Sequence, residues 1–277
     1  MRPAPRGLIL DMDGVLYRGD RPLPGLREFF AVAAARRYTL VTNNSLVTRQ
    51  ECQAKLCRMG VGVPAAAILT VSDAVGTYLT AEMPPGSRAL VLGSPALRAA
   101  VTGSGLRLAD GPARAPADVV VVGLDTELSY GALAEAIRAV AAGARFVATS
   151  LDPVLLTEEG IAPGTGAIVA AITACVHSEP VCVGKPSPAM FATAAARLGL
   201  AAAEILVVGD SLAADIAGGS AAGARTALLL SGVSGPADLS PHRPDLVFDG
   251  LPDLSAFLTE AWQEPDRAGV PPGVLSL

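Results

Sequence analysis

Two aspartates separated by a single residue, Asp11 and Asp13, are the first groups in the chain whose types and spacing could do chemistry together. Residues two apart on an extended strand face the same way, so both carboxylates can approach one point, and Gly14 permits a tight turn directly after them. A third carboxylate, Asp210, follows the apolar run Ile205–Val208. Three carboxylates at one place repel one another unless a cation neutralises them, and an all-oxygen ligand set suits Mg²⁺. The pattern predicts a magnesium site.

Two further apolar runs end in groups that suit a phosphate. Lys185 follows the run Val181–Val183 and supplies a positive charge for a phosphoryl group or for a nucleophile. Thr42, with the backbone amides around Asn43 and Asn44, offers hydrogen-bond donors for the remaining phosphate oxygens. Together with the aspartates, these residues predict phosphoryl transfer, a reaction that requires positioning and charge stabilisation and little else from the protein.

The elements that must position these residues form an alternating pattern. Short apolar runs rich in branched residues alternate with alanine-rich helical stretches, which favours parallel sheets covered by helices. The expected strands are Leu8–Leu10, Tyr38–Val41, Ala89–Leu92, Val119–Val122, Arg145–Ala148, Val181–Val183, Ile205–Val208 and Thr226–Leu230. The expected helices lie near 25–36, 47–59, 72–81, 95–102, 129–142, 166–175, 188–198 and 213–221. Because ligands bind at the carboxyl ends of parallel strands, we expect the four reactive strand ends to share one site.

The segment between Thr42 and Lys185 is much longer than one crossover connection needs, and it has a strand–helix rhythm of its own. The predicted fold class is therefore α/β, with a Rossmann-like parallel sheet core and an inserted second α/β domain. The expected core domain is discontinuous and comprises residues 1–75 and 180–264, the insert comprises 76–179, and residues 265–277 form a flexible tail.

Charge and composition exclude several functional classes. The net charge is −5, so the chain lacks the basic footprint of a nucleic-acid partner. The first apolar run is too short for a signal-peptide core, and the uncharged stretch 160–178 is interrupted by Pro163 and Gly164, so we expect no membrane segment and a cytoplasmic location.

The small number of histidines and the spacing of the cysteines exclude further kinds of catalytic and metal site. The four cysteines show no Cys-x-x-Cys spacing and are expected to be reduced, buried thiols. Two histidines offer little material for a zinc site or a Ser-His-Asp triad. Acid–base chemistry must therefore come from carboxylates. Of the two lysines in this arginine-rich chain, Lys55 is expected to be an ordinary residue on a helix surface.

Four motifs occur in order along almost the whole chain, from about residue 7 to 260. They are Asp11-Met12-Asp13-Gly14-Val15-Leu16, Val41-Thr42-Asn43-Asn44-Ser45, Val183-Gly184-Lys185-Pro186 and Val208-Gly209-Asp210 through Asp215-Ile216. With these motifs the sequence resembles the haloacid dehalogenase-like phosphohydrolases. It is most similar to their capped subfamily of para-nitrophenylphosphatase, phosphoglycolate phosphatase and N-acetylglucosamine-phosphate phosphatase types.

The resemblance implies a role for each reactive residue. Asp11 would be the nucleophile that forms an aspartyl-phosphate, and Asp13 would be the general acid for the leaving alkoxide and then the base for water. Mg²⁺ would be held by Asp11, the backbone carbonyl of Asp13, and Asp210. Asp215 would stand behind the metal and orient a water or Lys185. An aspartate at position 13 favours a phosphatase over the dehalogenase and phosphonatase branches.

The resemblance also implies that the insert is a cap that covers the site and selects the substrate. Its candidate specificity loop is 149–160, with Ser150, Asp152 and Leu155 as candidate contacts, although a plain surface connection is the alternative. Leu155 lies near the position where pyridoxal-phosphate phosphatases carry histidine, which disfavours that substrate. Glu158 and Glu159 would repel a leaving group that carries extra negative charge. We expect a small, neutral or hydroxyl-bearing phosphomonoester such as a glycerol, glycolate or sugar phosphate.

Two rival interpretations share some of these residues. A phospho-accepting receiver domain also combines aspartates, a threonine, a lysine and Mg²⁺, but it is about half as long and accepts phosphate after a later strand. A non-enzymatic metal- or phosphate-binding regulatory protein on the same fold is the second alternative. Turnover of para-nitrophenyl phosphate with and without Mg²⁺ would separate them. Alanine-rich helix faces on the insert could pair two copies into a homodimer.

Overall fold

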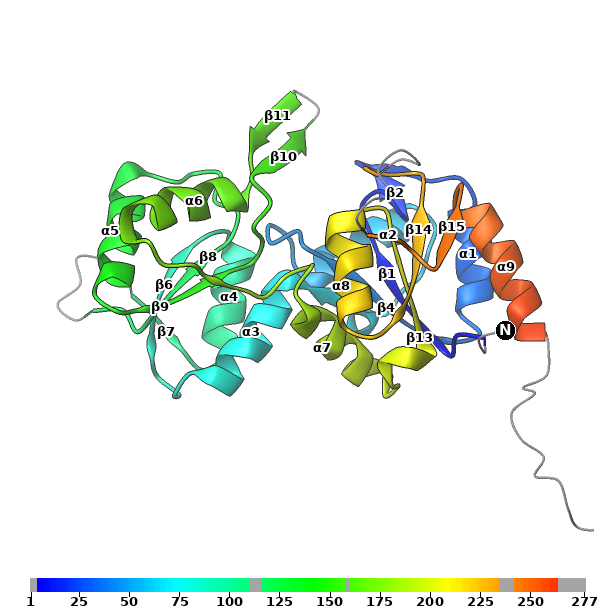
Figure 1. The fold of residues 1–277 in the computed structure, drawn as a ribbon, viewed down its shortest axis with the longest axis horizontal. Helices are drawn as coiled ribbons and strands as arrows, with labels where there is room; N and C mark the ends of the chain where they lie inside the picture. Colours follow the sequence, from blue (N-terminus) through cyan, green and yellow to red (C-terminus); the bar gives the residue numbers. More distant parts are fainter. Residues whose placement is uncertain (1–3, 110–115, 158–159, 235–241, 264–277) are drawn as a thin grey trace, which may run out of the picture.

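Two parallel sheets lie side by side in the computed structural model, which describes residues 4–109, 116–157, 160–234 and 242–263 (Figure 1). The tail that we expected at 265–277 lies outside these residues. The first sheet has the order β15-β14-β13-β1-β4-β5, and all of its pairings are parallel. Its strands are β1 (Gly7–Asp11), β4 (Arg37–Thr42), β5 (Ile68–Thr70), β13 (Ile205–Gly209), β14 (Arg225–Leu229) and β15 (Leu246–Phe248).

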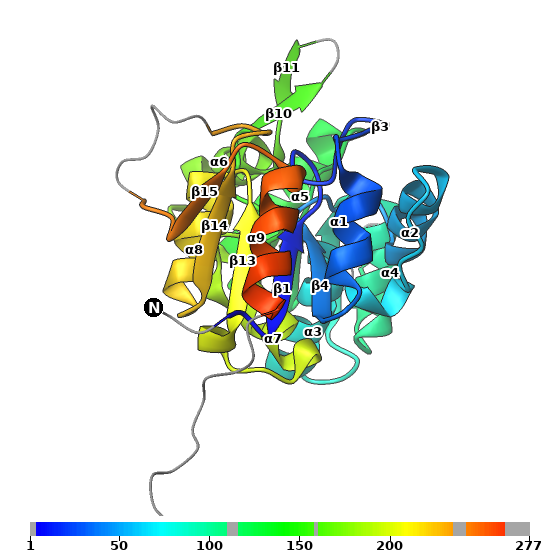
Figure 2. The ribbon, with the colours of Figure 1, turned by 90° about the vertical axis from the view of Figure 1, so that its right-hand side faces the viewer.

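Helices cover both faces of this sheet because its strands alternate their buried side chains between the two faces. Leu8 and Leu10 of β1 belong to one cluster, and Ile9 between them belongs to another. The first face is covered by α1 (Leu26–Ala33), α2 (Arg49–Arg58) and α9 (Leu251–Gln263), and α1 and α9 lie in front of the sheet in Figure 2. The second face is covered by α7 (Pro188–Leu198) and α8 (Ala217–Ala221).

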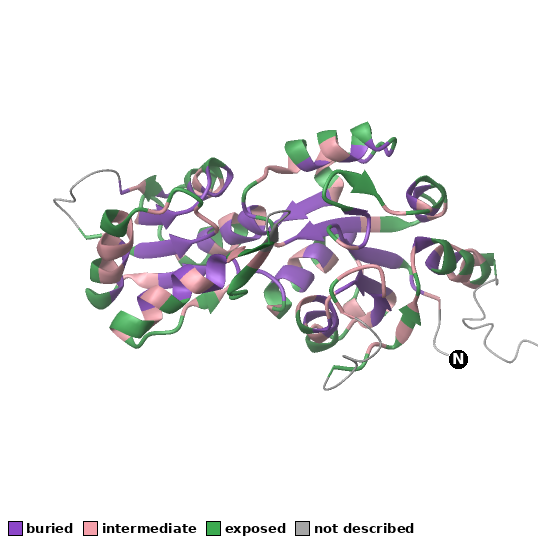
Figure 3. Ribbon diagram, turned by 90° about the horizontal axis from the view of Figure 1, so that it is seen from above, coloured by how far each residue is buried: buried purple, intermediate pink, exposed green. Residues whose placement is uncertain are grey.

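The second sheet has the order β12-β9-β8-β6-β7 and is also parallel. Its strands are β6 (Arg88–Leu92), β7 (Arg107–Leu108), β8 (Val119–Val122), β9 (Arg145–Ala148) and β12 (Val181–Cys182). Helices α3 (Val71–Glu82) and α4 (Pro95–Gly103) pack on one face, and α5 (Tyr130–Ala141) and α6 (Thr165–Val176) pack on the other. Figure 3 shows that buried residues run through the strands of both sheets.

These two sheets confirm the predicted α/β fold class with a parallel core and a second α/β unit. The domain boundaries stay a prediction, and two features bear on them. Strand β12, which we had expected in the core domain, pairs with β9 of the second sheet. Helix α3 runs across the expected boundary at residue 76. Its residues Val75 and Leu79 pack in one cluster with strands of both sheets.

Several elements, most of them short, were not expected from the sequence. They are β5, β15 and α9, two small 3₁₀ turns at Ala65–Ala67 and Ala202–Glu204, the short strands β2 (Tyr17–Arg18), β3 (Arg21–Pro22) and β7, and a hairpin of β10 (Val154–Thr157) with β11 (Gly160–Pro163). The expected helix near 213–221 is instead a π-helical turn, Leu212–Ile216, followed by α8. None of the helices in the described chain has the length and apolar character needed to cross a membrane.

The cysteines are free thiols, but the expectation that all four are buried is wrong, because Cys57 and Cys175 are exposed. Burial raises the pKa of Cys52 and of Cys182 to about 11. At pH 8 only a small fraction of these two thiols is ionised, and the thiolate is the reactive form. We therefore expect iodoacetamide to alkylate Cys57 and Cys175 first, with labelling of Cys182 accelerating only as the pH approaches 11. Peptide mass mapping of partial labelling checks this order, and equal rates for all four would contradict it.

Candidate active site

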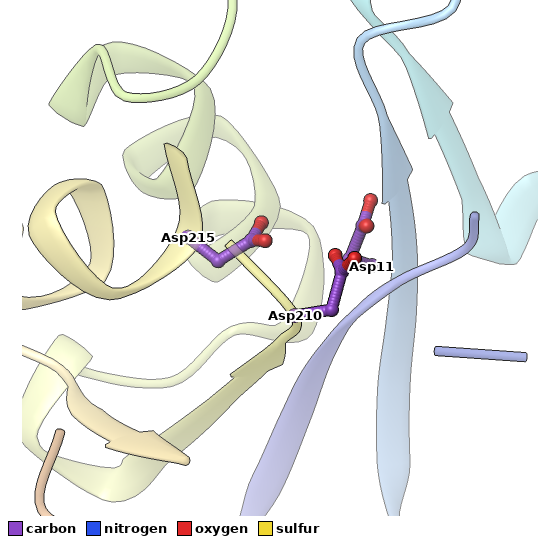
Figure 4. A group of neighbouring side chains, drawn as sticks. All are labelled: Asp11, Asp210 and Asp215. Atoms are coloured by element: carbon purple, nitrogen blue, oxygen red, sulfur yellow. The ribbon is translucent and has the colours of Figure 1, made fainter. Parts of the chain in front are cut away.

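Two neighbouring parallel strands bring two aspartates to the same edge of the first sheet. Asp11 is the last residue of β1, and Asp210 directly follows β13, with Leu10 of β1 paired to Val208 of β13. Asp215 joins them from the π-helical turn after β13. The three side chains point toward one another in Figure 4, all three are buried, and one carboxylate oxygen from each lies within 4.8 Å of the others. This edge therefore gathers three carboxylates in a space shielded from water.

Lys185 enters this cluster from the second sheet, three residues after the end of β12. Its Nζ donates to Asp11 Oδ1 at 2.5 Å and to Asp215 Oδ1 at 2.7 Å, and the side chain is 4% exposed. The Asn43 side chain holds the backbone of Lys185, donating through Nδ2 to its carbonyl and accepting from its N–H, both at 2.9 Å. A Cβ at position 184 would lie 2.0 Å from the Thr149 carbonyl oxygen, so only glycine allows the chain this path.

The charges in the cluster do not balance. Burial raises the pKa of Asp11 to about 6, against the opposing effect of Lys185 and with a further increase from the negative charge of Asp210. Burial likewise raises the pKa of Asp215 to about 6, again opposed by Lys185. Burial alone would lower the pKa of Lys185, but its contacts with Asp11 and Asp215 raise it overall. Three carboxylates share one ammonium, so the cluster can accommodate a further cation.

Gly14 allows the turn after β1 to approach Asp210 closely. Its φ is +81°, and a Cβ at this position would lie 2.2 Å from Asp210 Oδ2, which accepts the Val233 N–H at 2.9 Å. We expect Gly14→Ala to lower the free energy of unfolding by roughly 1–2 kcal/mol, because an alanine is strained at positive φ. Displacement of the Asp210 carboxylate should also lower activity on the order of 100-fold.

The matched control for this prediction is Gly19→Ala. Gly19 also has a positive φ of +54°, but no atom lies within 4 Å of a Cβ built there. Thermal unfolding and phosphatase assays of both variants separate the two effects. Gly19→Ala should lose stability and keep its activity, and a Gly14→Ala variant that keeps full activity would contradict the geometry described for Asp210.

Asp13 lies beside this cluster and is exposed, and its carboxylate is not among the three that lie within 4.8 Å of one another. The backbone turns back after Asp13, with the Gly14 N–H donating to the Tyr17 carbonyl at 2.8 Å. Tyr17 forms an isolated β-bridge with Asp13, and its side chain lies beside the Asp13 carboxylate. Burial of Tyr17, together with the negative charge of Asp13, raises the pKa of the tyrosine, so the hydroxyl keeps its proton.

Thr42 and the loop after it line the other side of Asp11. Thr42 is the last residue of β4, is 3% exposed, and accepts the Asn44 N–H on its hydroxyl oxygen at 3.1 Å. The Asn44 side chain accepts the Leu46 N–H at 2.9 Å, so the side chains of Asn43 and Asn44 both shape the backbone. Phosphate binding through the amides of this loop stays a prediction.

Ser45 connects this loop to the second sheet, which the sequence did not reveal. Its Oγ accepts the Leu124 N–H at 3.1 Å, and its carbonyl accepts the Ser94 hydroxyl. Ser45 and Ser94 are both buried. The two partners follow β8 and β6, so the carboxyl ends of these strands are bonded directly to the loop that begins at Thr42.

The expected specificity loop 149–160 is wrong in one respect, because its second half is strand β10 of the projecting hairpin. The apolar run that begins at Val154 and the positive φ of Gly160 favour a hairpin there. Ser150 is buried; its Oγ donates to Asp152 Oδ2 at 3.2 Å and accepts the Asp152 N–H at 3.1 Å. Leu155 is half-buried on β10, and Glu158 and Glu159 lie outside the described residues.

Lys55 is not the ordinary surface residue that we expected. Its Nζ lies 4.0 Å from the centroid of the Tyr17 ring, and its side chain is 25% exposed. Tyr17 and Lys55 were both missed as site residues. The only sequence signal was the scarcity of lysine, because the other lysine of the chain is Lys185 at the centre of the site.

The sequence matches known families and proteins over most of its length. A family model described as haloacid dehalogenase-like hydrolase matches residues 8–107, and a second HAD-hydrolase-like model matches residues 182–254. The chain is 32% identical over 261 residues to the dihydroxyacetone phosphatase of Corynebacterium glutamicum, with 93% of this chain and 92% of that protein covered.

Two further similarities concern Mycobacterium tuberculosis. The chain is 37% identical over 231 residues to a D-glycerol 3-phosphate phosphatase; the match covers 82% of this chain and 63% of the relative, which is less than two thirds of that protein's length. A solved structure of glycerol phosphate phosphatase from this organism in complex with magnesium superposes with a TM-score of 0.84 at 35% identity, covering 92% of this chain and 78% of the other.

Proposed function

The chain belongs to the haloacid dehalogenase-like hydrolase family, among its capped phosphatases, and we propose that it hydrolyses a small phosphomonoester through an aspartyl-phosphate on Asp11. One observation carries the proposal. Asp11 ends a buried strand, is held by Lys185 Nζ at 2.5 Å, and lies beside a second carboxylate, Asp13, that is exposed. A buried nucleophile next to an accessible acid is the pairing that two-step phosphate transfer requires.

The residues at this edge fit a magnesium ion. The buried oxygens of Asp11, Asp210 and Asp215 are the hard donors that Mg²⁺ prefers, and one lysine leaves their charge incompletely neutralised. We propose that Asp11 and Asp210 hold the ion with the backbone carbonyl of Asp13, and that Asp215 orients Lys185. When bound, the ion offsets the negative charge of the phosphate oxygens and helps to orient them.

The protein residues then divide the reaction into two steps. In the first, an Asp11 oxygen attacks phosphorus, the bond from phosphorus to the ester oxygen breaks, and Asp13 donates its proton to the leaving alkoxide. In the second, Asp13 takes a proton from water as the water oxygen attacks phosphorus, which releases phosphate and restores Asp11. Lys185 orients Asp11 in both steps, and Thr42 with the following backbone amides donates to the phosphate oxygens.

We further propose that the second sheet acts as a cap that selects the substrate. The loop that begins at Thr42 and the carboxyl ends of β6 and β8 are joined through Ser45, which would couple the cap to the phosphate end of the site. Two similar proteins are named D-glycerol 3-phosphate phosphatase and dihydroxyacetone phosphatase. With Ser150 and Asp152 as the polar groups of the specificity segment, we propose a glycerol, glycolate or sugar phosphate as the substrate.

A phosphomonoester screen with the purified protein and Mg²⁺ tests this proposal. We expect glycerol, glycolate and sugar phosphates to be hydrolysed with higher kcat/KM than nucleotides and bisphosphates, and turnover to stop when EDTA removes the metal. Higher kcat/KM for nucleotides or bisphosphates would contradict the substrate class. Turnover that persists in EDTA would contradict the metal site.

A further inference from the structure

Tyr17 and Lys55 form a small network around Asp13 that the reaction described above does not use. The turn that begins at Gly14 folds the chain back, so that the Tyr17 carbonyl accepts the Gly14 N–H at 2.8 Å. The β-bridge between Asp13 and Tyr17 places the tyrosine side chain beside the Asp13 carboxylate, where its hydroxyl can donate a hydrogen bond. Tyr17 itself is 3% exposed, whereas Asp13 is exposed. A buried phenol therefore lies beside a carboxylate that faces solvent.

Lys55 reaches the same network from α2, on a different part of the chain. Its Nζ lies 4.0 Å from the centre of the Tyr17 ring, within the range of a cation–π contact. The nearest carboxylate to it is that of Asp20, at 3.8 Å, but this side chain is 93% exposed and would contribute little. Burial raises the pKa of Asp13, and the positive charge of Lys55 opposes that increase.

The residue type at position 55 supports a specific role. The chain has 21 basic residues, of which only Lys55 and Lys185 are lysines, and both lie at this site. Either cation can lie over a ring, but a guanidinium also presents a planar fork that pairs bidentately with carboxylates, whereas a lysine ammonium is a compact charge. A lysine here can hold the Tyr17 ring without drawing the Asp13 carboxylate into a bidentate ion pair.

We propose that Tyr17 and Lys55 are positioning residues for Asp13. The Tyr17 hydroxyl fixes the Asp13 carboxyl group in the orientation that delivers its proton to the leaving oxygen, and Lys55 holds the Tyr17 ring in place. As the bond from phosphorus to the ester oxygen breaks, the proton moves from Asp13 to that oxygen, and Tyr17 keeps its own proton throughout. This inference rests on the proposed function, in which Asp13 is the acid.

Two substrates with different leaving groups test the inference. An alkyl phosphate such as glycerol phosphate releases an alkoxide that needs a proton, whereas para-nitrophenyl phosphate releases a phenolate that leaves without one. For each, kcat/KM reports the transfer of phosphate to Asp11 and not the later hydrolysis. We expect Tyr17→Phe and Lys55→Met to lower kcat/KM for glycerol phosphate about tenfold, a part of the effect of a whole general acid. The value for para-nitrophenyl phosphate should change less than about twofold.

Matched variants control for loss of a phenol or of a positive charge as such. Tyr38→Phe removes a phenol that packs in the same hydrophobic cluster but edge-on to Phe30, and Arg58→Met removes an exposed charge near the end of α2. Both should leave the ratio of the two kcat/KM values unchanged. Lys55→Arg retains a cation for the ring, but its guanidinium can form a bidentate ion pair with the Asp13 carboxylate, so we expect it not to restore the activity toward glycerol phosphate.

The ratio of the two substrates is independent of how much protein is folded, so a destabilised variant still gives an answer. Equal losses on both substrates, or no loss on either, would overturn the inference. Asp13→Asn separates this failure from a failure of the proposed function. If Asp13→Asn lowers kcat/KM for glycerol phosphate more than for para-nitrophenyl phosphate and the Tyr17 and Lys55 variants do not, only the inference about Tyr17 and Lys55 is wrong. If Asp13→Asn lacks it, Asp13 is not the acid and the proposed function falls as well.

Discussion

Replacement of Asp11 by asparagine should abolish turnover, with kcat falling by a factor on the order of 10³ or more. The amide that replaces the carboxylate is a poor nucleophile, and no other carboxylate of the cluster is proposed to attack phosphorus. Asparagine keeps the shape of the side chain and can still accept the hydrogen bond from Lys185 Nζ. A steady-state assay with glycerol phosphate and para-nitrophenyl phosphate measures the effect, and both substrates should lose activity.

The stability of the same variant shows whether activity is lost because the nucleophile is missing or because the protein unfolds. Asp11 is one of three buried carboxylates that share one lysine, so removing its charge relieves repulsion in the cluster. We expect the Tm of Asp11→Asn to be equal to or higher than that of the wild-type protein. Asp253→Asn, an exposed substitution on α9, is the control and should change neither activity nor Tm. Substantial phosphatase activity in a folded Asp11→Asn protein would refute the assignment.

Asp13→Asn should cause the second large loss of activity, and the size of the loss should depend on the substrate. For glycerol phosphate, the loss of the general acid should lower kcat/KM by about 10²–10⁴-fold. For para-nitrophenyl phosphate, the first step needs no proton and should proceed, but the hydrolysis of the aspartyl-phosphate lacks its base. We therefore expect a rapid burst of one equivalent of para-nitrophenolate per site, followed by slow turnover. Stopped-flow absorbance measures both phases.

The wild-type protein is the reference for this experiment, since its two steps are both assisted by Asp13. Asp253→Asn controls for the loss of an exposed carboxylate outside the proposed site. That variant should show no burst. An Asp13→Asn protein that slows both substrates to the same extent, without a burst, would contradict the assignment of Asp13 as acid and base.

Strands and their reactive ends were predictable because they depend on local patterns. The expected strands at Val119–Val122 and Arg145–Ala148 coincide with β8 and β9. The aspartates after β1 and β13 meet because parallel neighbours end at one sheet edge. Short or partly exposed elements were not predicted. Strand β15, for example, spans only Leu246–Phe248, and none of its residues is buried.

Contacts between distant parts of the chain were not predictable from residue patterns. The assignment of β12 to the second sheet depends on its pairing with β9, which periodicity does not encode. Likewise, Tyr17 and Lys55 are brought together by the way α2 packs against the turn after β1. Asn43 was expected near phosphate through the backbone amides of its loop, which stays a prediction, and the pattern did not reveal that its side chain holds the backbone of Lys185. Each of these features needs the three-dimensional arrangement.

The central claim is that phosphate is transferred to Asp11, and peptide mapping of the trapped intermediate tests it most directly. Asp13→Asn protein mixed with para-nitrophenyl phosphate and Mg²⁺ is quenched in acid within the burst phase, digested, and examined by mass spectrometry. We predict a phosphoryl group on the peptide that contains Asp11, located on Asp11 itself and absent when Asp11 is also replaced by asparagine. Phosphate on another residue, or a burst without any phosphorylated peptide, would contradict the account.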